Sequence, residues 1–244
     1  MKVTAVVNQK GGVGKTAITF HLTWGLAQKG LRVLCIDLDP QGHLSGAFRQ
    51  TGCSALNIFD ENPRIEAHPV RPNIFVVSSS PDLMKMDARL SVQTLFKLRK
   101  ALRSVRDFDM VVADCPPNLG VLTLNGLCAA TSALIPVAPN FFSLRALDEL
   151  WGLLGELREE GLNQHLQSVG IVRNFWERTL VCREVDEILS ERFRKELLTV
   201  KIPKSVRVEE ALQEGRPVWE VEPNATVSAA FRDFINEFLE REGL

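Results

Sequence analysis

A glycine-rich segment near the N-terminus has the residue types of a phosphate-binding loop. Residues 8–16 read Asn-Gln-Lys-Gly-Gly-Val-Gly-Lys-Thr and follow a short β-branched run. A glycine-rich turn before a helix directs backbone N–H groups and the helix dipole toward phosphate oxygens. Lys15 could reach the outer phosphates, and the Thr16 hydroxyl could bind Mg²⁺. The usual pattern has glycine at position 9, whereas this chain has Gln9 followed by an additional lysine, Lys10. The segment predicts a nucleotide-binding loop of an unusual kind.

The same residues also fit a second pattern, that of dinucleotide-binding proteins. Gly12, Gly14 and Ala17 match G-x-G-x-x-[GA], and Asp37 lies about 20 residues further on, where an acid would bind a ribose. A dinucleotide loop has no use for a lysine–threonine pair directly after its second glycine. The phosphate-loop interpretation is therefore favoured, with a dinucleotide-binding protein as the minor alternative.

Carboxylates follow two further apolar runs. Residues 33–36 lead into Asp37 and Asp39, and residues 110–113 lead into Asp114. In a phosphate-loop nucleotidase, an acid at the end of a buried strand beside the loop helps to hold the metal ion. Asp114 suits that role. Asp37 and Asp39 are two residues apart, so both could face the phosphates, one near the metal and one near an attacking water.

Alternating apolar runs and amphipathic stretches must position these residues. The predicted strands are 3–7, 31–36, 74–77, 110–113, 133–137 and 169–172, and the predicted helices are 15–29, 92–106, 119–130, 143–160, 180–196 and 227–241. Such alternation is typical of an α/β fold with a doubly wound, mostly parallel sheet and helices on both faces. We expect a single domain over residues 1–244, without an N-terminal helix-turn-helix domain, because the phosphate loop begins so early.

Composition agrees with an ordinary globular protein. The chain has 29 Lys and Arg against 30 Asp and Glu, with 45% hydrophobic and 24% charged residues. A disordered chain is thereby excluded. No apolar run reaches the ~18 residues of a membrane span. Five cysteines without C-x-x-C spacing indicate reduced thiols in the cytoplasm rather than disulfides.

Taken together, these motifs make the chain similar to one known family. They resemble the deviant-Walker ATPases of the ParA/Soj type, in the ParA/MinD superfamily. The matching segments span nearly the whole chain and comprise 10–16, 37–42, 114–120, 135–137, 170–172, 202–207, 210–211 and 215–217. His43 and Asn118 stand where the family pattern would have asparagine and serine.

The resemblance implies a homodimer that forms on ATP and holds two nucleotides between its subunits. Lys10 would cross the interface and reach the partner's phosphates, which offsets the repulsion between two facing triphosphates. Asp39 would position the attacking water. Asp114 and Thr16 would organise Mg²⁺, with Asp37 as a further candidate metal residue. The expected cofactors are thus ATP and Mg²⁺.

The resemblance also indicates which residues contact the nucleotide. Lys15 would act in catalysis together with Lys10 and Asp39. Pro203 and Ser205 match positions that flank the adenine. The complete set of expected nucleotide-binding residues is Lys10, Gly11, Gly12, Val13, Gly14, Lys15, Thr16, Ala17, Pro203 and Ser205.

Features outside the loop favour one branch of the superfamily. A chain without tyrosine cannot be a tyrosine autokinase, and the acidic face of helix 227–241 is unlike the basic tail of MinD-like regulators. The remaining interpretation is a DNA partition ATPase of the cytoplasm that associates with the nucleoid. It would hydrolyse ATP slowly, under stimulation by a ParB-like or cargo adaptor protein, and would not need a membrane. The alternative is a MinD-like or cargo-positioning ATPase that acts on a protein complex or a membrane.

Partition requires sequence-independent DNA binding, which Lys and Arg contacts to phosphates can provide. One candidate surface is the helix 92–106, which carries five cations and no acid. The other lies in the C-terminal half, and we favour it because the resemblance implies a DNA surface there, beside the dimer interface. Its residues are Arg178, Arg194, Lys204, Arg207 and Arg216.

Overall fold

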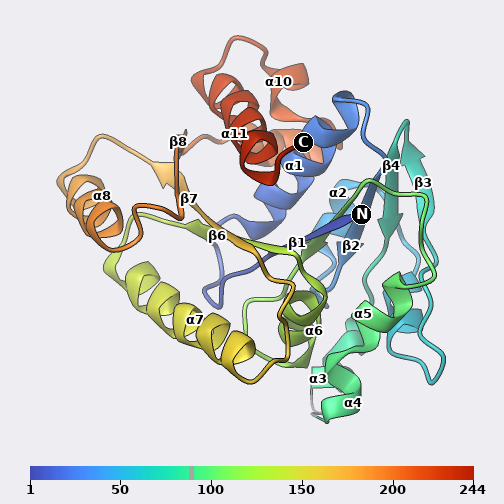
Figure 1. Ribbon diagram of the computed structural model, residues 1–244. Helices are drawn as coiled ribbons and strands as arrows, with labels where there is room; N and C mark the ends of the chain where they lie inside the picture. The colour runs from blue at the N-terminus through green and yellow to red at the C-terminus, as the bar shows by residue number, and fades with distance from the viewer. Residues whose placement is uncertain (88–90) are drawn as a thin grey trace.

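An eight-stranded sheet forms the centre of the computed structural model, which describes residues 1–87 and 91–244 (Figure 1). The strand order is β3-β4-β2-β5-β1-β6-β7-β8, and all neighbours are parallel except β3 and β4. The strands are β1 (Lys2–Val6), β2 (Val33–Asp37), β3 (His68–Arg71), β4 (Ile74–Val77), β5 (Met110–Asp114), β6 (Ser132–Val137), β7 (Ser168–Trp176) and β8 (Leu197–Pro203).

Helices cover both faces of the sheet, as predicted for a doubly wound fold. Helices α1, α10 and α11 lie over one face, and α6 and α7 lie over the other (Figure 1). The helices are α1 (Lys15–Gln28), α2 (His43–Ala47), α3 (Met84–Asp87), α4 (Val92–Leu95), α5 (Lys97–Leu102), α6 (Val121–Ala129), α7 (Phe141–Glu159), α8 (Leu180–Arg192), α9 (Arg207–Glu214), α10 (Val218–Val221) and α11 (Thr226–Glu242), with short 3₁₀ helices at Ser54–Ile58 and Pro81–Leu83.

The register of the central strands gathers the acids at one edge. Strands β2, β5 and β6 are buried along their whole length, as expected of apolar runs in a parallel sheet. Asp37 at the end of β2 pairs with Asp114 at the end of β5, and Val6 of β1 pairs with Asp114 on the other side. The phosphate loop, which leaves β1, therefore begins beside both carboxylates.

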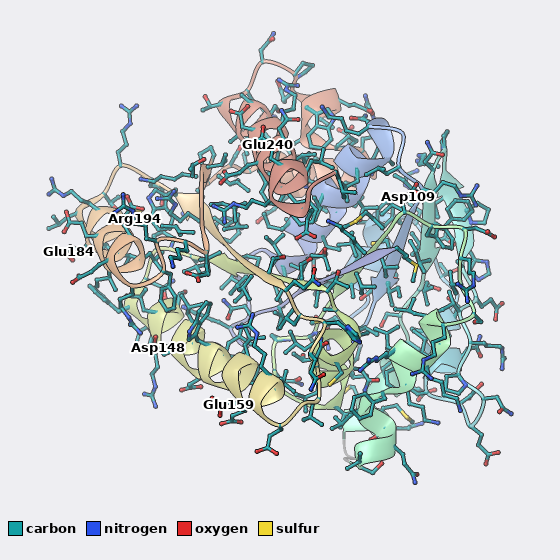
Figure 2. All side chains as sticks on the ribbon, in the orientation of Figure 1. Asp109, Asp148, Glu159, Glu184, Arg194 and Glu240 are labelled. Carbon is teal, nitrogen blue, oxygen red and sulfur yellow. The ribbon has the colours of Figure 1, made fainter. Side chains whose placement is uncertain are left out.

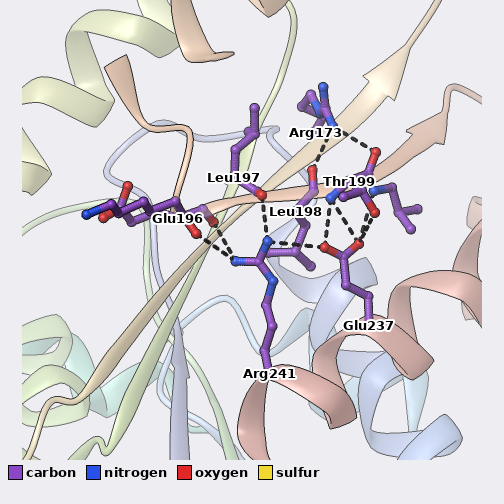
Figure 3. A network of polar contacts seen from close by, with 9 residues as sticks. Arg173, Glu196, Leu197, Leu198, Thr199, Glu237 and Arg241 are labelled. Carbon is purple, nitrogen blue, oxygen red and sulfur yellow. Dashed lines mark hydrogen bonds and ion pairs between the residues drawn. The ribbon is translucent and has the colours of Figure 1, made fainter. Parts of the chain in front are cut away.

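Strand β8 was not among the predicted strands, and distant side chains complete it. Its pairing with β7 is irregular. The Arg173 guanidinium donates hydrogen bonds to the carbonyls of Leu198 and Thr199. The Glu237 carboxylate of α11 accepts hydrogen bonds from the N–H groups of Thr199 and Val200 (Figure 3). Side chains thus replace the missing strand-to-strand bonds. The predicted strands were runs that are apolar on both faces, whereas this half-exposed edge strand alternates polar and apolar residues, which is itself a strand signal that was overlooked.

The predicted helix 92–106 is wrong as a single element. The structure has two short helices, α4 and α5, with Arg106 beyond both of them. The buried side chain of Asn125 accepts a hydrogen bond from Leu98 N–H and donates one to the Thr94 carbonyl. These two backbone groups would bond to each other in a continuous helix. Asn125 therefore interrupts the helix between them.

Helix α11, predicted as residues 227–241, docks on the core. Its apolar stripe of Phe231, Phe234, Ile235 and Phe238 is buried. The stripe packs against α1 and β8. Among the described residues, no helix is both long and apolar enough to pass through a bilayer.

A buried histidine links α1 to the α10–α11 segment. His21 Nδ1 donates to the Ala17 carbonyl at 2.7 Å, and Nε2 accepts the Val218 N–H at 3.1 Å. Its ring stacks on Phe231 with the centroids 4.2 Å apart. Burial lowers the pKa of His21 from 6.5 to about 4, because a charged imidazole would lose its water and its acceptor role at Nε2.

We expect His21 to make the stability of the fold depend on pH. Its stabilising contribution is complete above pH 6.5, the unfolded-state value, and is lost as the pH falls toward about 4. The shift corresponds to about 3 kcal/mol of unfolding free energy across that window. Urea unfolding of the wild type and of His21→Gln between pH 7 and pH 4 measures it, and the variant should lose less stability. If the unfolding free energies of the two proteins fell equally with pH, His21 would not be the source of the pH dependence.

Candidate nucleotide-binding site

The loop after β1 has the backbone of a phosphate cradle. Gly12 and Gly14 have φ values of +71° and +89°, which side-chain-bearing residues rarely adopt. Gly14 precedes α1, and no side chain caps that helix. The first-turn N–H groups of a helix have no partner within the helix, so they can bind an anion.

Asn174 supports this loop, and the sequence analysis missed it. The buried Asn174 side chain donates a hydrogen bond to the Val13 carbonyl at 2.8 Å. A Cβ atom on Gly14 would lie 2.1 Å from Asn174 Nδ2 and 3.2 Å from the Phe175 ring. Glycine is thus required at this position by contact as well as by conformation. The sequence feature that could have identified Asn174 is its polar side chain near the end of the apolar run of β7.

Lys15 lies inside the loop. The residue is 7% exposed, and Nζ donates to the Lys10 carbonyl at 3.2 Å, across the loop. Burial lowers the pKa of Lys15, while the nearby Asp114 and Asp39 carboxylates oppose that change. A buried ammonium group in the first turn of α1, whose N–H groups have no partner within the helix, is well suited to phosphate oxygens.

The structure brings the Thr16 and Asp114 side chains into contact. Thr16 Oγ1 donates to Asp114 Oδ2 at 2.7 Å, and Thr19 Oγ1 lies 3.3 Å from Asp114 Oδ1. Burial, with Asp37 alongside, raises the pKa of Asp114 to about 8. Two neighbouring buried carboxylates next to a threonine hydroxyl would be stabilised by a divalent cation. The residues present therefore fit Mg²⁺.

Asp37 and Asp39 have different surroundings. The Asp37 carboxylate accepts hydrogen bonds from Ser45 N–H (2.8 Å), Ser45 Oγ (2.6 Å) and Asp39 N–H (3.1 Å), and burial raises its pKa to about 6. The Asp39 carboxylate accepts one from Gln41 N–H at 3.0 Å. These bonds tie Asp37 to the segment 39–45, and its carboxylate is too deeply buried to bind a ribose, which disfavours the dinucleotide alternative. Its role toward Mg²⁺ stays a prediction. Asp39 is less constrained.

Lys10 points away from Lys15, toward the start of α7. Its Nζ donates to Asn140 Oδ1 and lies 3.5 Å from Ser143 Oγ and 5.7 Å from the centre of the Phe142 ring. Asn140 is also the N-cap of α7, accepting the Ser143 N–H at 3.0 Å. The additional lysine therefore lies outside the phosphate cradle, at its rim. Asn140 and Ser143 were not predicted as site residues.

The adenine candidates lie at the end of β8. Pro203 pairs with Trp176 at the end of β7, and Lys204 N–H donates to the Trp176 carbonyl at 3.3 Å. Ser205 Oγ accepts the Arg207 N–H at 3.3 Å. Since the Phe175 ring approaches Gly14, this segment reaches the same edge of the sheet as the loop. Their contact with adenine stays a prediction.

The predicted DNA-binding cations do not form one uniform surface. Lys204 pairs with Glu177, Arg207 with Glu210 and Glu222, and Arg216 with Glu214 and Glu220, at 2.8–3.7 Å. Arg178 and Arg194 are exposed. Figure 2 shows Arg194 at the periphery beside α8, with Glu184 and Asp148 on the same side of the molecule. Three of the five predicted DNA-binding cations are thus paired with carboxylates of the same chain.

A mostly parallel sheet whose first strand leads through this loop into a helix defines a P-loop nucleotide-binding protein. The family profile described as an AAA domain matches residues 1–168. The chromosome-partitioning ATPase Soj of Thermus thermophilus is 34% identical over 241 residues, covering 97% of this chain and 95% of the relative.

Two solved structures are similar over nearly their whole length. The apo structure of McdA from Cyanothece has a TM-score of 0.88 at 21% identity and covers 98% of this chain and 99% of its own. Cobyrinic acid a,c-diamide synthase from Mycobacterium smegmatis, with bound ADP and magnesium, has a TM-score of 0.82 at 27% identity, with 100% and 96% covered. The chain belongs to the ParA/MinD-type P-loop ATPases.

Proposed function

We propose that this chain is a DNA partition ATPase of plasmids or chromosomes. It dimerises on ATP, binds DNA without sequence preference and hydrolyses ATP slowly until a ParB-like or cargo adaptor protein stimulates it. It would act in the cytoplasm, associated with the nucleoid. The observation that carries the proposal is the additional lysine, Lys10, at the rim of a ParA-type phosphate loop. The 34% identity to Soj over 97% of the chain supports it.

The proposed chemistry follows from the site. Lys15 and the first-turn N–H groups of α1 would hold the phosphates. Thr16 and Asp114 would hold Mg²⁺, which supplies positive charge to the phosphates when bound. Asp39 would accept a hydrogen bond from a water molecule and orient it toward the γ-phosphorus. ADP and magnesium in the cobyrinic acid a,c-diamide synthase structure support these ligands.

Exposed apolar side chains near the phosphate loop support the dimer. Nine large apolar side chains are exposed among the described residues, and five of them lie where α7, α8 and α9 begin. These helices follow β6, β7 and β8, so their first residues lie at the same edge of the sheet as the loop. A second copy would cover them. The five residues are Phe141, Phe142, Leu180, Val181 and Val206.

DNA co-sedimentation with ATP, with ADP and without nucleotide tests the function as a whole. The proposal expects retention on DNA with ATP and release in the other two conditions. A protein that dimerises with ATP but never co-sediments with DNA would favour the cargo-positioning alternative.

Lys10→Ala is expected to keep ATP binding by the monomer and to lose the ATP-dependent dimer. The reason is that Lys10 lies outside the cradle, at the edge that would face a partner. Nucleotide titration and sedimentation velocity with ATP measure the two properties. Lys29→Ala, at the exposed end of α1, serves as the control. An intact dimer of Lys10→Ala would remove Lys10 from the interface.

DNA affinity is expected to be indifferent to sequence and to fall steeply with salt, by a slope of about 0.9 per phosphate contact. Arg207→Glu should weaken it more than Arg103→Glu, since Arg207 begins α9 next to the proposed dimer edge. Its ion pairs with Glu210 and Glu222 would be exchanged for phosphate contacts. Salt titrations of DNA affinity for the wild type and both variants, at a fixed nucleotide concentration, show which substitution weakens binding more. Greater damage from Arg103→Glu would move the DNA surface to the α5 region.

A further inference from the structure

A basic groove lies across α4 and α5, outside the nucleotide-binding site. Its volume is about 690 Å³, within the range of about 300–1,000 Å³ that is usual for ligand pockets. Helices α4 and α5 lie over the same face as α6, beside α3 (Figure 1). The side chains that determine its chemistry are Val92, Phe96, Lys97, Arg99, Lys100 and Arg103.

The described residues do not neutralise the cations of this groove. Of the residues that the structure describes, none forms an ion pair with Arg99, Lys100 or Arg103. Lys97 Nζ donates to a backbone carbonyl, that of Asp60, at 2.6 Å. Glu61 is the one carboxylate in the described lining, against four cations. The groove is therefore strongly positive in a chain whose formal net charge is −1.

Apolar surface lies among these charges. Val92 is 70% exposed, and Phe96 between the two helices is partly exposed. Asn125 bonds the α4–α5 junction to α6 through Leu98 N–H and the Thr94 carbonyl, at 3.1 and 2.8 Å. The junction is thus held in place by a buried side chain, which reduces the conformational entropy that binding would cost.

We propose that this groove binds an acidic, amphipathic peptide segment of a partner protein. Carboxylates of such a segment would pair with Lys100 and Arg103, and its apolar side chains would cover Val92 and Phe96. Duplex DNA fits less well, because its convex outer surface is lined mainly by phosphates and offers little apolar area to cover Val92 and Phe96. The proposal does not depend on the ATPase cycle, and it assigns a surface to a partner by charge and shape complementarity.

Fluorescence anisotropy of the full chain tests the proposal with two short labelled peptides, one alternating glutamate with leucine and one alternating lysine with leucine. The wild type should bind the acidic peptide and not the basic one. Lys100→Glu combined with Arg103→Glu should weaken acidic-peptide binding about tenfold or more. Val92→Ser should weaken it through loss of apolar contact. Arg158→Glu, at an exposed position near the end of α7, is the matched control and should bind as the wild type does.

A short random-sequence duplex distinguishes nucleic acid from peptide. The proposal expects Val92→Ser to reduce affinity for the peptide and to leave affinity for the duplex unchanged. Wild-type affinity of the double variant for the acidic peptide would overturn it, as would failure of the wild type to bind that peptide. Loss of duplex binding in the double variant, with peptide binding unaffected, would assign the groove to DNA instead. Circular dichroism confirms that each variant is folded, so every comparison is decisive.

Discussion

Lys15→Ala is expected to abolish measurable ATP binding. The lysine is buried at the centre of the loop, and its ammonium group reaches across to the Lys10 carbonyl. Alanine would remove the positive charge that contacts the phosphates. Loss of a charge-assisted hydrogen bond costs about 3 kcal/mol of binding free energy, which corresponds to about 100-fold in affinity. Titration with a fluorescent ATP analogue measures this loss.

Two comparisons make the Lys15→Ala result specific. Lys29→Ala changes a lysine at the exposed far end of α1 and should bind ATP as the wild type does. The fold of Lys15→Ala should survive, since burial disfavours the charged form of Lys15 in the free protein and lowers its pKa. If the variant bound ATP with unchanged affinity, the phosphate-loop assignment would be wrong.

Asp39→Ala is expected to bind ATP, form the dimer and hydrolyse about 100-fold to 10,000-fold more slowly, the range for loss of a group that assists proton transfer. The loop and the Thr16–Asp114 pair remain, whereas the water loses its orienting acid. Phosphate release under single-turnover conditions measures the rate, and sedimentation with ATP measures the dimer. Turnover close to that of the wild type would transfer the role to another group.

Asp37→Ala is the matched comparison because its carboxylate has a structural task. It accepts hydrogen bonds from the Ser45 hydroxyl and from the N–H groups of Ser45 and Asp39. Its removal leaves buried donors unpaired, which typically costs about 1–3 kcal/mol each. Asp37→Ala should therefore lower the free energy of unfolding, which Asp39→Ala should leave nearly unchanged. Comparison of the two variants therefore separates an effect on hydrolysis from an effect on the stability of the fold.

The sequence by itself determined the phosphate loop and the central strands. The loop is a local backbone motif, so its glycines, Lys15 and Thr16 are positioned by their own neighbours and by the start of α1. Likewise, buried parallel strands require continuous apolar runs, and these run directly into Asp37 and Asp114. Each signal is confined to a few consecutive residues, and this is why it could be recognised without a structure.

Only the tertiary structure decided how distant side chains complete these elements. Asn125 divides the predicted helix 92–106, and Arg173 with Glu237 completes β8. Asn174 fits against Gly14 and excludes any side chain there. Asp37 and Asp39, equivalent in the sequence pattern, are separated by the bonds that Ser45 makes to one of them. Each of these results depends on a contact between residues brought together by folding, and the free energy of such a contact is not encoded in the local residue pattern.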